Sequence, residues 1–248
     1  VGAARDAALG VRFVDGTGTV VKNGGRVMKN VTGYDLVKLL AGSRGVLGVL
    51  TEVSFKVQAR PEAEATLVIE GLGDADGLAA LRSALGSPFD VSGAARHSGR
   101  SLVRVEGMAG SVAYRVAQLR DRLGGAVTAV TAEASAALWR DVRDVVPLQE
   151  KSGEVWRIST LPTAAAGIVA GLEGEAVWDW GGGLVWVLLE HGRGPDVAAA
   201  VAGRGHAMLV KGQGGPVFPP VAPDVAALVA GLKAKFDPRG ILNAGMMG

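Results

Sequence analysis

The chain has 248 residues, enough for one large domain or two small ones with a proper core. Apolar residues make up 48% of it, which excludes an intrinsically disordered protein. The formal net charge is +2 and the basic residues are scattered, so a nucleic-acid-binding protein built on a basic patch is excluded. No apolar run approaches the length of a membrane span. The lack of cysteine excludes disulfides and any iron–sulfur cluster ligated by this chain, and we expect a cytoplasmic location.

The first elements expected are two short strands, residues 11–15 and 19–22. The turn Gly16-Thr17-Gly18 between them predicts a hairpin.

Two glycine turns flank a short helix within residues 24–57. Asp35 stands where an N-cap belongs, ahead of four apolar residues, and Gly42 ends the helix as a glycine at positive φ does. The helix start offers unpaired backbone N–H groups and a partial positive charge, which favour a bound anion. A ligand can also lie against main chain that has no Cβ, at Gly33, Gly45 and Gly48. The alternative is a strand–turn–helix–turn–strand unit whose glycines only form turns.

From residue 51 the pattern has a period of two, which predicts a strand. One face is expected to carry Thr51, Val53, Phe55 and Val57, and the other Glu52, Ser54 and Lys56. Arg60-Pro61 interrupts this pattern and marks an expected domain boundary.

Beyond residue 61, strands and helices alternate twice in the same order, β-α-β-β-α-β, which is that of a ferredoxin-like unit. Two such units side by side predict an antiparallel sheet with helices on one face. The expected strands are 66–71, 88–94, 101–107, 126–130, 155–160, 176–180, 184–190 and 206–210, and the expected helices are 74–85, 111–123, 132–145, 163–171 and 195–203. A Gly- and Pro-rich loop then leads to a last helix that starts at Pro223.

Several residue strings resemble a family signature. They are KNVTGYDL at 29–36, GSRGVLGVLTEV at 42–53, RPEAEAT at 60–66, WDWGG at 178–182 and FDPRGILN at 236–243. Together they resemble the FAD-linked oxidases with a vanillyl-alcohol-oxidase-type (PCMH-type) flavin domain, which include D-lactate and glycolate dehydrogenases. Within that family the likeness is to the FAD-binding subunits of bacterial glycolate oxidases.

The resemblance implies an α+β fold: the C-terminal part of a PCMH-type FAD-binding domain plus a ferredoxin-like antiparallel-sheet cap domain. The implied domains are a partial FAD-binding domain at 1–60, the cap at 61–222, and a segment at 223–248 that returns to the FAD domain. In the family, a glycine-rich loop for the FAD pyrophosphate lies upstream, whereas Gly181-Gly182-Gly183 here reads as a hairpin turn. We therefore expect a truncated chain, and a protein that has lost half of its flavin site is the alternative.

By the same resemblance the cofactor is FAD, held mainly by residues 29–49. A helix cap is the alternative role for Asp35. A turn residue is the alternative role for Asn243, because Ala244 replaces a proline of the family's closing motif. The implied cofactor-binding residues are Lys29, Asn30, Thr32, Gly33, Tyr34, Asp35, Gly42, Ser43, Gly45, Gly48, Val49 and Asn243.

No catalytic residue and no metal site is predicted. The three histidines, His97, His191 and His206, are not spaced as metal ligands. Glu190-His191 echoes a catalytic Glu-His pair of the related dehydrogenases, but a histidine at a strand end is the favoured interpretation.

Arg140 and Arg143 could together bind the carboxylate of a 2-hydroxy acid, since a guanidinium matches carboxylate geometry. Acidic neighbours make an exposed helix face the favoured interpretation. The tryptophans of the expected strands are assigned to the core or the sheet faces, with contact to a partner subunit as the alternative; they are Trp156, Trp178, Trp180 and Trp186.

The function implied by the resemblance is that of the FAD-binding subunit of a glycolate oxidase complex, which converts glycolate to glyoxylate and passes electrons through flavin to an acceptor. The implied partners are a catalytic flavin subunit and an iron–sulfur subunit, with peripheral attachment to the inner membrane through them left open. Because the family's histidine pair is absent, we expect an electron relay rather than a substrate-binding subunit, and this chain alone to be inactive. The alternatives are a free-standing FAD-dependent D-lactate or 2-hydroxy-acid dehydrogenase, and a flavin-free structural subunit.

Overall fold

The computed structural model of the chain describes residues 3–26, 33–124, 126–212, 217–218 and 221–246. The chain divides into two compact units. The first unit is Val1–Ala59 with Pro220–Gly248, and the second unit is Arg60–Pro219.

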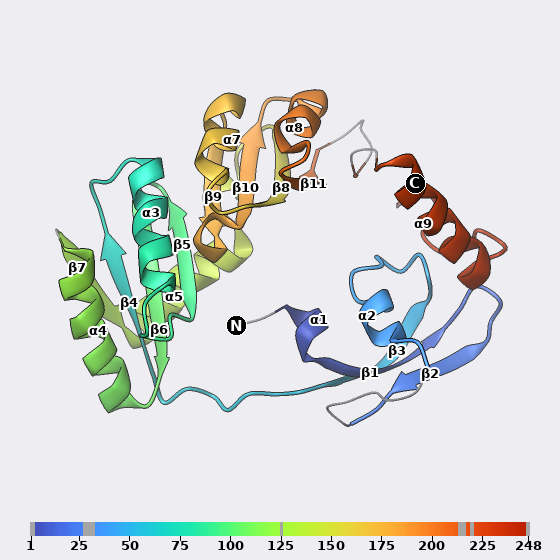
Figure 1. Ribbon diagram of the computed structural model, residues 1–248, viewed down its shortest axis with the longest axis horizontal. Coiled ribbons are helices and arrows are strands. Elements are labelled where there is room, and N and C mark those ends of the chain that lie inside the picture. The colour runs from blue at the N-terminus through green and yellow to red at the C-terminus, as the bar shows by residue number, and fades with distance from the viewer. Residues whose placement is uncertain (1–2, 27–32, 125, 213–216, 219–220, 247–248) are drawn as a thin grey trace. The chain divides into compact units, whose positions relative to one another are not determined.

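The first unit is built on a three-stranded antiparallel sheet of order β2–β1–β3 (Figure 1). Its elements are α1 (Ala4–Ala7), β1 (Ala8–Val14), β2 (Val20–Gly24), α2 (Leu36–Leu40), β3 (Val49–Phe55) and α9 (Pro223–Phe236). The predicted hairpin of β1 and β2 is confirmed. Asp15 fixes its turn, because the carboxylate accepts hydrogen bonds from the N–H groups of Thr17 and Thr19 at 2.8 and 3.0 Å.

Phe13 is at the centre of the core of the first unit. Its side chain is fully buried and packs with Val37 and Leu40 of α2. From α9, Leu232 and Phe236 pack against the same cluster, and the Phe13 and Phe236 ring centroids are 6.1 Å apart. Both helices therefore cover the sheet face on which Phe13 lies.

Strand β3 departs from the predicted alternation only at Thr51. Phe13 lies opposite Leu50, and Val11 lies opposite Val53, with an irregularity in the register between Arg12 and Phe13. Opposed residues of an antiparallel pair point to the same side of the sheet, so Leu50 and Val53 lie on the side of Phe13, where they are 47% and 38% exposed. The register confirms the predicted alternation of Glu52, Val53 and Ser54, whereas Thr51 is the extra residue of a bulge and departs from it.

The second unit contains an eight-stranded antiparallel sheet of order β11–β8–β10–β9–β5–β6–β4–β7. Its strands are β4 (Ala63–Ile69), β5 (Gly93–His97), β6 (Arg100–Gly107), β7 (Val127–Thr131), β8 (Glu154–Thr160), β9 (Glu175–Asp179), β10 (Leu184–Leu189) and β11 (Gly205–Lys211). Its helices are α3 (Asp74–Leu85), α4 (Ala109–Leu123), α5 (Ala132–Asp144), α6 (Val146–Gln149), α7 (Ala165–Leu172) and α8 (Gly194–Val201). Each half has the predicted β-α-β-β-α-β order, and the halves meet where Arg96 of β5 pairs with Trp178 of β9.

Helices pack against both faces of this sheet, so the prediction of helices on one face was wrong. The first face carries α3, α4, α7 and α8 over the large apolar core. On the second face, Val142 of α5 packs against Val68 and Leu102, and Leu148 of α6 packs against Val155. Apolar stripes on α5 and α6 thus cover part of the face that the sequence pattern left open.

The strand expected at 88–94 was also misplaced, because β5 begins only at Gly93. Asp90 has φ of 49°, a left-handed conformation that a strand does not accommodate.

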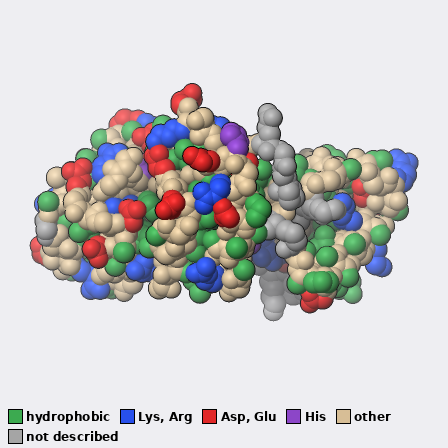
Figure 2. Space-filling view, turned by 90° about the horizontal axis from the view of Figure 1, so that it is seen from above, with side chains coloured by type: hydrophobic (Ala, Val, Ile, Leu, Met, Phe, Trp, Pro, Cys, Tyr) green, Lys and Arg blue, Asp and Glu red, His purple; other side chains and the backbone are tan. Residues whose placement is uncertain are grey.

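On the face drawn in Figure 2, Lys and Arg side chains are interspersed with Asp and Glu, and neither sign forms a patch of its own. None of the helices described is both long enough and apolar enough to cross a membrane.

Candidate functional site

The start of α2 already has partners for its backbone donors. Asp35 is the N-cap, and its Oδ1 accepts a hydrogen bond from the N–H of Lys38 at 3.1 Å. Asn23 of β2 accepts from the N–H of Leu36 and donates to the carbonyl of Tyr34, both at 3.0 Å. The cap role of Asp35 is confirmed. Asn23 and Asp35 thus occupy two of the N–H groups that the sequence analysis assigned to an anion.

The loop after α2 turns through backbone conformations that favour glycine. Gly42, at φ of 89°, follows the helix as predicted, and Gly45 has φ of 76°. Between them Ser43 is buried, and its N–H donates to the carbonyl of Leu40 at 3.0 Å. The loop is therefore a fixed turn with main chain at its surface.

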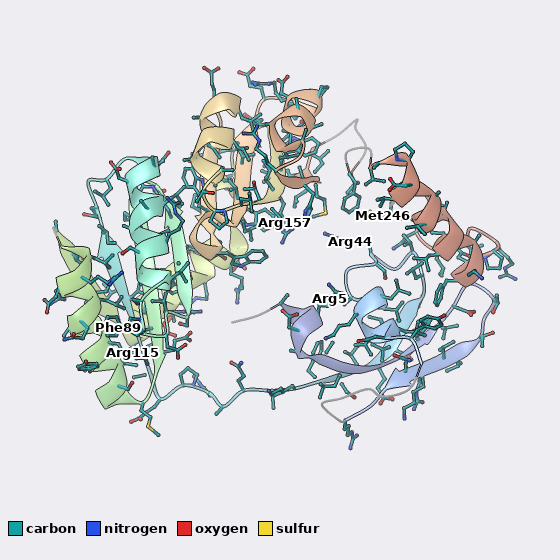
Figure 3. All side chains as sticks on the ribbon, viewed as in Figure 1. Arg5, Arg44, Phe89, Arg115, Arg157 and Met246 are labelled. Atoms are coloured by element: carbon teal, nitrogen blue, oxygen red, sulfur yellow. The ribbon has the colours of Figure 1, made fainter. Side chains whose placement is uncertain are left out.

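The C-terminal tail is tied to this loop. The Asn243 side-chain amide donates to the carbonyl of Arg44 at 2.6 Å, and a Cβ on Gly45 would lie 2.9 Å from its Nδ2. The buried Asp237 carboxylate holds the tail by accepting from the N–H groups of Ile241 and Leu242 at 3.1 and 2.8 Å. Arg44 and Met246, labelled in Figure 3, mark the loop and the end of the described tail. The loop and the tail thus bring together four of the predicted cofactor-binding residues, as a common cofactor site requires: Gly42, Ser43, Gly45 and Asn243.

The remaining predicted contacts are more dispersed. A Cβ on Gly48 would lie 2.6 Å from Cδ2 of Phe13, so packing of the core, rather than a ligand, accounts for this glycine. Gly33 has open space around its Cα, and Tyr34 and Val49 are 87% and 56% exposed. The predicted residues Lys29, Asn30 and Thr32 lie outside the described residues.

The sequence is 36% identical over 248 residues to glycolate oxidase subunit GlcE of Escherichia coli, a match that covers 99% of this chain and 66% of that protein. The chain belongs to the FAD-linked oxidase family. Glycolate oxidase subunit GlcD of Bacillus subtilis is 40% identical over 67 residues, which are 27% of this chain and 14% of GlcD. The chain thus spans about two thirds of the length of one of these relatives and a small part of the other.

A solved structure of alkyldihydroxyacetonephosphate synthase has the same fold, with a TM-score of 0.60 at 15% identity, over 98% of this chain and 53% of that one. No family model matches the sequence.

The histidines of this FAD-linked oxidase chain are apart from one another. His191 is exposed at the end of β10, where its Nδ1 lies 3.9 Å from Oε1 of the buried Glu154. His97 is buried in β5, and burial, followed by the charge of Arg100, lowers its pKa below the ordinary 6.5. Among the described residues, no three His, Asp or Glu side chains gather as metal ligands do.

The two arginines of α5 are exposed and paired with neighbours. Arg140 pairs with Glu133, and Arg143 pairs with Asp144 at 2.7 Å, so the favoured interpretation of an exposed helix face agrees with their contacts.

One cluster of the second unit was missed by the sequence analysis. Arg157 of β8 lies over two aromatic rings, with its guanidinium carbon 5.7 Å from the Trp180 centroid and 5.8 Å from the Trp186 centroid. Beside them, burial raises the pKa of the Asp179 carboxyl above its ordinary 3.8, against the opposing hydrogen bond from the N–H of Trp180 and the charge of Arg104. The string Trp-Gly-Gly-Gly at 180–183 is the sequence signal for this cluster, since consecutive glycines allow a tight turn that contains a bulky residue.

Proposed function

We propose that the protein is the FAD-binding subunit of a glycolate oxidase complex. The observation that carries the proposal is the 36% identity to GlcE along 99% of the chain. Such a match includes both units and the tail, so the likeness is not confined to a flavin-binding segment shared by many enzymes.

The first unit has features that fit part of an FAD site. Gly42 and Gly45 in the loop after α2 have positive φ, and Asn243 fixes this loop by a hydrogen bond to the carbonyl of Arg44. Leu50 and Phe55 of the edge strand β3 are 47% and 51% exposed, which gives an apolar surface that a planar ring system can cover. We assign Gly33, Tyr34, Gly42, Ser43, Gly45, Val49 and Asn243 as the residues toward FAD.

Two other predicted residues have different roles in this assignment. Asp35 shapes the loop as a helix cap, and Gly48 makes room for Phe13. Because Asp35 and Asn23 occupy donors at the start of α2, the pyrophosphate of FAD is assigned to a different part of the protein.

FAD, when bound, supplies the two-electron acceptor for the reaction. Glycolate loses a hydride from its carbon and a proton from its hydroxyl to become glyoxylate, and the electrons pass on to a further acceptor. All three histidines belong to the second unit, and among the described residues none gathers with other His, Asp or Glu side chains as metal ligands do. We assign the chain electron relay rather than deprotonation of the substrate.

The proposed partners are a GlcD-like catalytic flavin subunit and an iron–sulfur subunit. A partner with cysteine ligands is required if a cluster carries the electrons onward, since this chain has no cysteine.

Reconstitution tests the proposal. The full-length protein is purified alone and with a co-expressed GlcD-like subunit and iron–sulfur subunit, and glycolate-dependent dye reduction is measured for each. We expect activity only in the assembled complex, and loss of activity when this protein is omitted. Full activity of the protein alone would favour a free-standing 2-hydroxy-acid dehydrogenase, and an active complex that lacks it would refute the relay role.

A further inference from the structure

The eight-stranded sheet of the second unit ends in two edge strands, β11 and β7, at opposite sides (Figure 1). The edge at β11 is protected in two ways. Its register against β8 is irregular between Leu209 and Lys211, and the N–H of Leu209 donates to the carbonyl of Val217 at 2.8 Å. Because a bulge and a lysine at an edge discourage pairing with another chain, β11 is not open to a further strand.

Strand β7 has no such protection. Its five residues, Val127–Thr131, include no charged residue, proline or glycine, and they pair with β4 in a regular register. Among the residues that the structure describes, none forms a hydrogen bond with the outward backbone groups of Thr128, Ala129 or Val130. A neutral, regular edge with free backbone donors and acceptors is a template for a further strand.

We propose that two copies of the chain associate by antiparallel pairing of their β7 strands, which joins the two eight-stranded sheets into one. With the two-fold axis at Ala129, this residue lies opposite its own copy and Thr128 lies opposite Val130. Val127 then lies opposite Thr131. Each pair therefore joins two β-branched residues or two alanines, and β-branched pairs stabilise a sheet.

The charges around β7 favour a second copy in the antiparallel direction. A charged side chain close to a two-fold axis would meet the same charge of the other copy, and β7 has none. The nearest charged residues along the chain are Arg122 before the strand and Glu133 after it. Antiparallel pairing brings the start of one β7 toward the end of the other, so these opposite charges approach each other. The Glu133 side chain is accessible, being 81% exposed although it pairs with Arg140.

Helix α4, on the first face of the sheet, leaves room for the second copy. One side of this helix carries Tyr114 and Arg115, which both contact Phe89 in the loop after α3, away from β7 (Figure 3). By helix geometry the other side carries Ala113 and Ala117, and both are exposed. Because these side chains are small, the copy of α4 can lie beside this helix without a clash.

The oligomeric state of the full-length protein, purified without partner subunits, tests the proposal. Sedimentation velocity over a dilution series should show a monomer–dimer equilibrium. Thr128→Lys, at an exposed position next to the proposed axis, brings two like charges together and should raise the dissociation constant of the dimer at least about 10-fold. His206→Lys, at an exposed position of the protected strand β11, is the matched control and should leave this constant unchanged.

A second charge separates loss of pairing from loss of folding. Thr128→Glu alone should also dissociate, since it again places like charges at the axis. An equimolar mixture of the Thr128→Lys and Thr128→Glu proteins should form a mixed dimer, because unlike charges then lie near each other. Recovery of the dimer in the mixture would show that both variants are folded.

A single cysteine locates the axis. Directly opposed residues of an antiparallel pair have Cα atoms about 4.5–5.5 Å apart, a separation that a disulfide can bridge. Because this chain has no cysteine of its own, Ala129→Cys should link two copies through position 129 on oxidation, as mass spectrometry of the linked peptides would show, and His206→Cys should not.

Three results would overturn the proposal. The first is a protein that stays monomeric over the whole dilution series. The second is a dimer that Thr128→Lys weakens no more than His206→Lys does. The third is a crosslink from position 129 to a partner subunit of the assembled complex and not to a second copy, since a strand of another protein would then occupy this edge.

Discussion

Replacing Gly48 by alanine separates a packing role from a cofactor role. The added Cβ would lie 2.6 Å from Cδ2 of Phe13 and 3.0 Å from the carbonyl oxygen of Val14. Carbon atoms pack at about 3.5–4.0 Å, so Phe13 would have to move by about 1 Å. Phe13 is fully buried between α2 and α9 and has no open space to enter. Overpacking of this kind costs about 1–3 kcal/mol.

Hydrogen–deuterium exchange of the β1 amides measures this cost where it arises. A loss of about 1–3 kcal/mol raises exchange through unfolding of the first unit about 5- to 140-fold. Gly25→Ala is the matched control, because a Cβ there meets nothing within 4 Å and the backbone φ is not positive. Unchanged β1 exchange in Gly48→Ala, together with weaker FAD binding, would refute the packing argument and return Gly48 to the cofactor site.

Three further predictions follow from individual side chains. Asn243→Ala removes the hydrogen bond to the carbonyl of Arg44 and should destabilise the tail by about 1 kcal/mol. Trypsin should then cleave faster after Arg239, and an unchanged cleavage rate would mean that Asp237 alone holds the tail. Because burial raises the pKa of Asp179 in the folded protein, the free energy of unfolding should fall as pH rises from 3.8 through that raised value. Asp179→Asn should remove this fall in urea titrations, and a larger fall in the variant would contradict the raised pKa. Because burial lowers the pKa of His97, the free energy of unfolding should fall as pH drops from 6.5 through the lowered value. His97→Gln should flatten this dependence of unfolding free energy on pH, and an equal dependence in both proteins would show that His97 does not cause it.

Local signals in the sequence predicted most of the elements. The cap at Asp35 and the glycine at 42 are short-range features, and α2 begins and ends beside them. The order of strands and helices also predicted the two ferredoxin-like halves, because that topology follows from element sequence alone.

Features that depend on distant pairing were not accessible in this way. The bulge that places Leu50 opposite Phe13 exists only when β3 pairs with β1. The face of the sheet against which α5 packs depends on Val68 and Leu102, which lie far from that helix in sequence. The role of Gly48 likewise required the position of Phe13, about 35 residues earlier, to be known.

The candidate site was predictable in part. The resemblance selected the loop from Gly42 to Val49 and the tail, and the structure joins them through Asn243. It gave no reason to single out Arg157, because a stack of arginine on two tryptophans from different strands has no sequence spacing of its own.

The FAD content of the full-length protein, purified without other flavin-binding subunits, tests the central proposal most directly. Visible absorbance and the flavin released on denaturation are measured for the unmodified protein, for Gly45→Val, which places a branched side chain beside Asn243 at positive φ, and for Gly25→Ala. The proposal predicts one FAD per chain in the unmodified protein and in Gly25→Ala, with strong loss in Gly45→Val. A colourless full-length protein that takes up no added FAD, yet assembles with its partners, would contradict it and favour a flavin-free structural subunit.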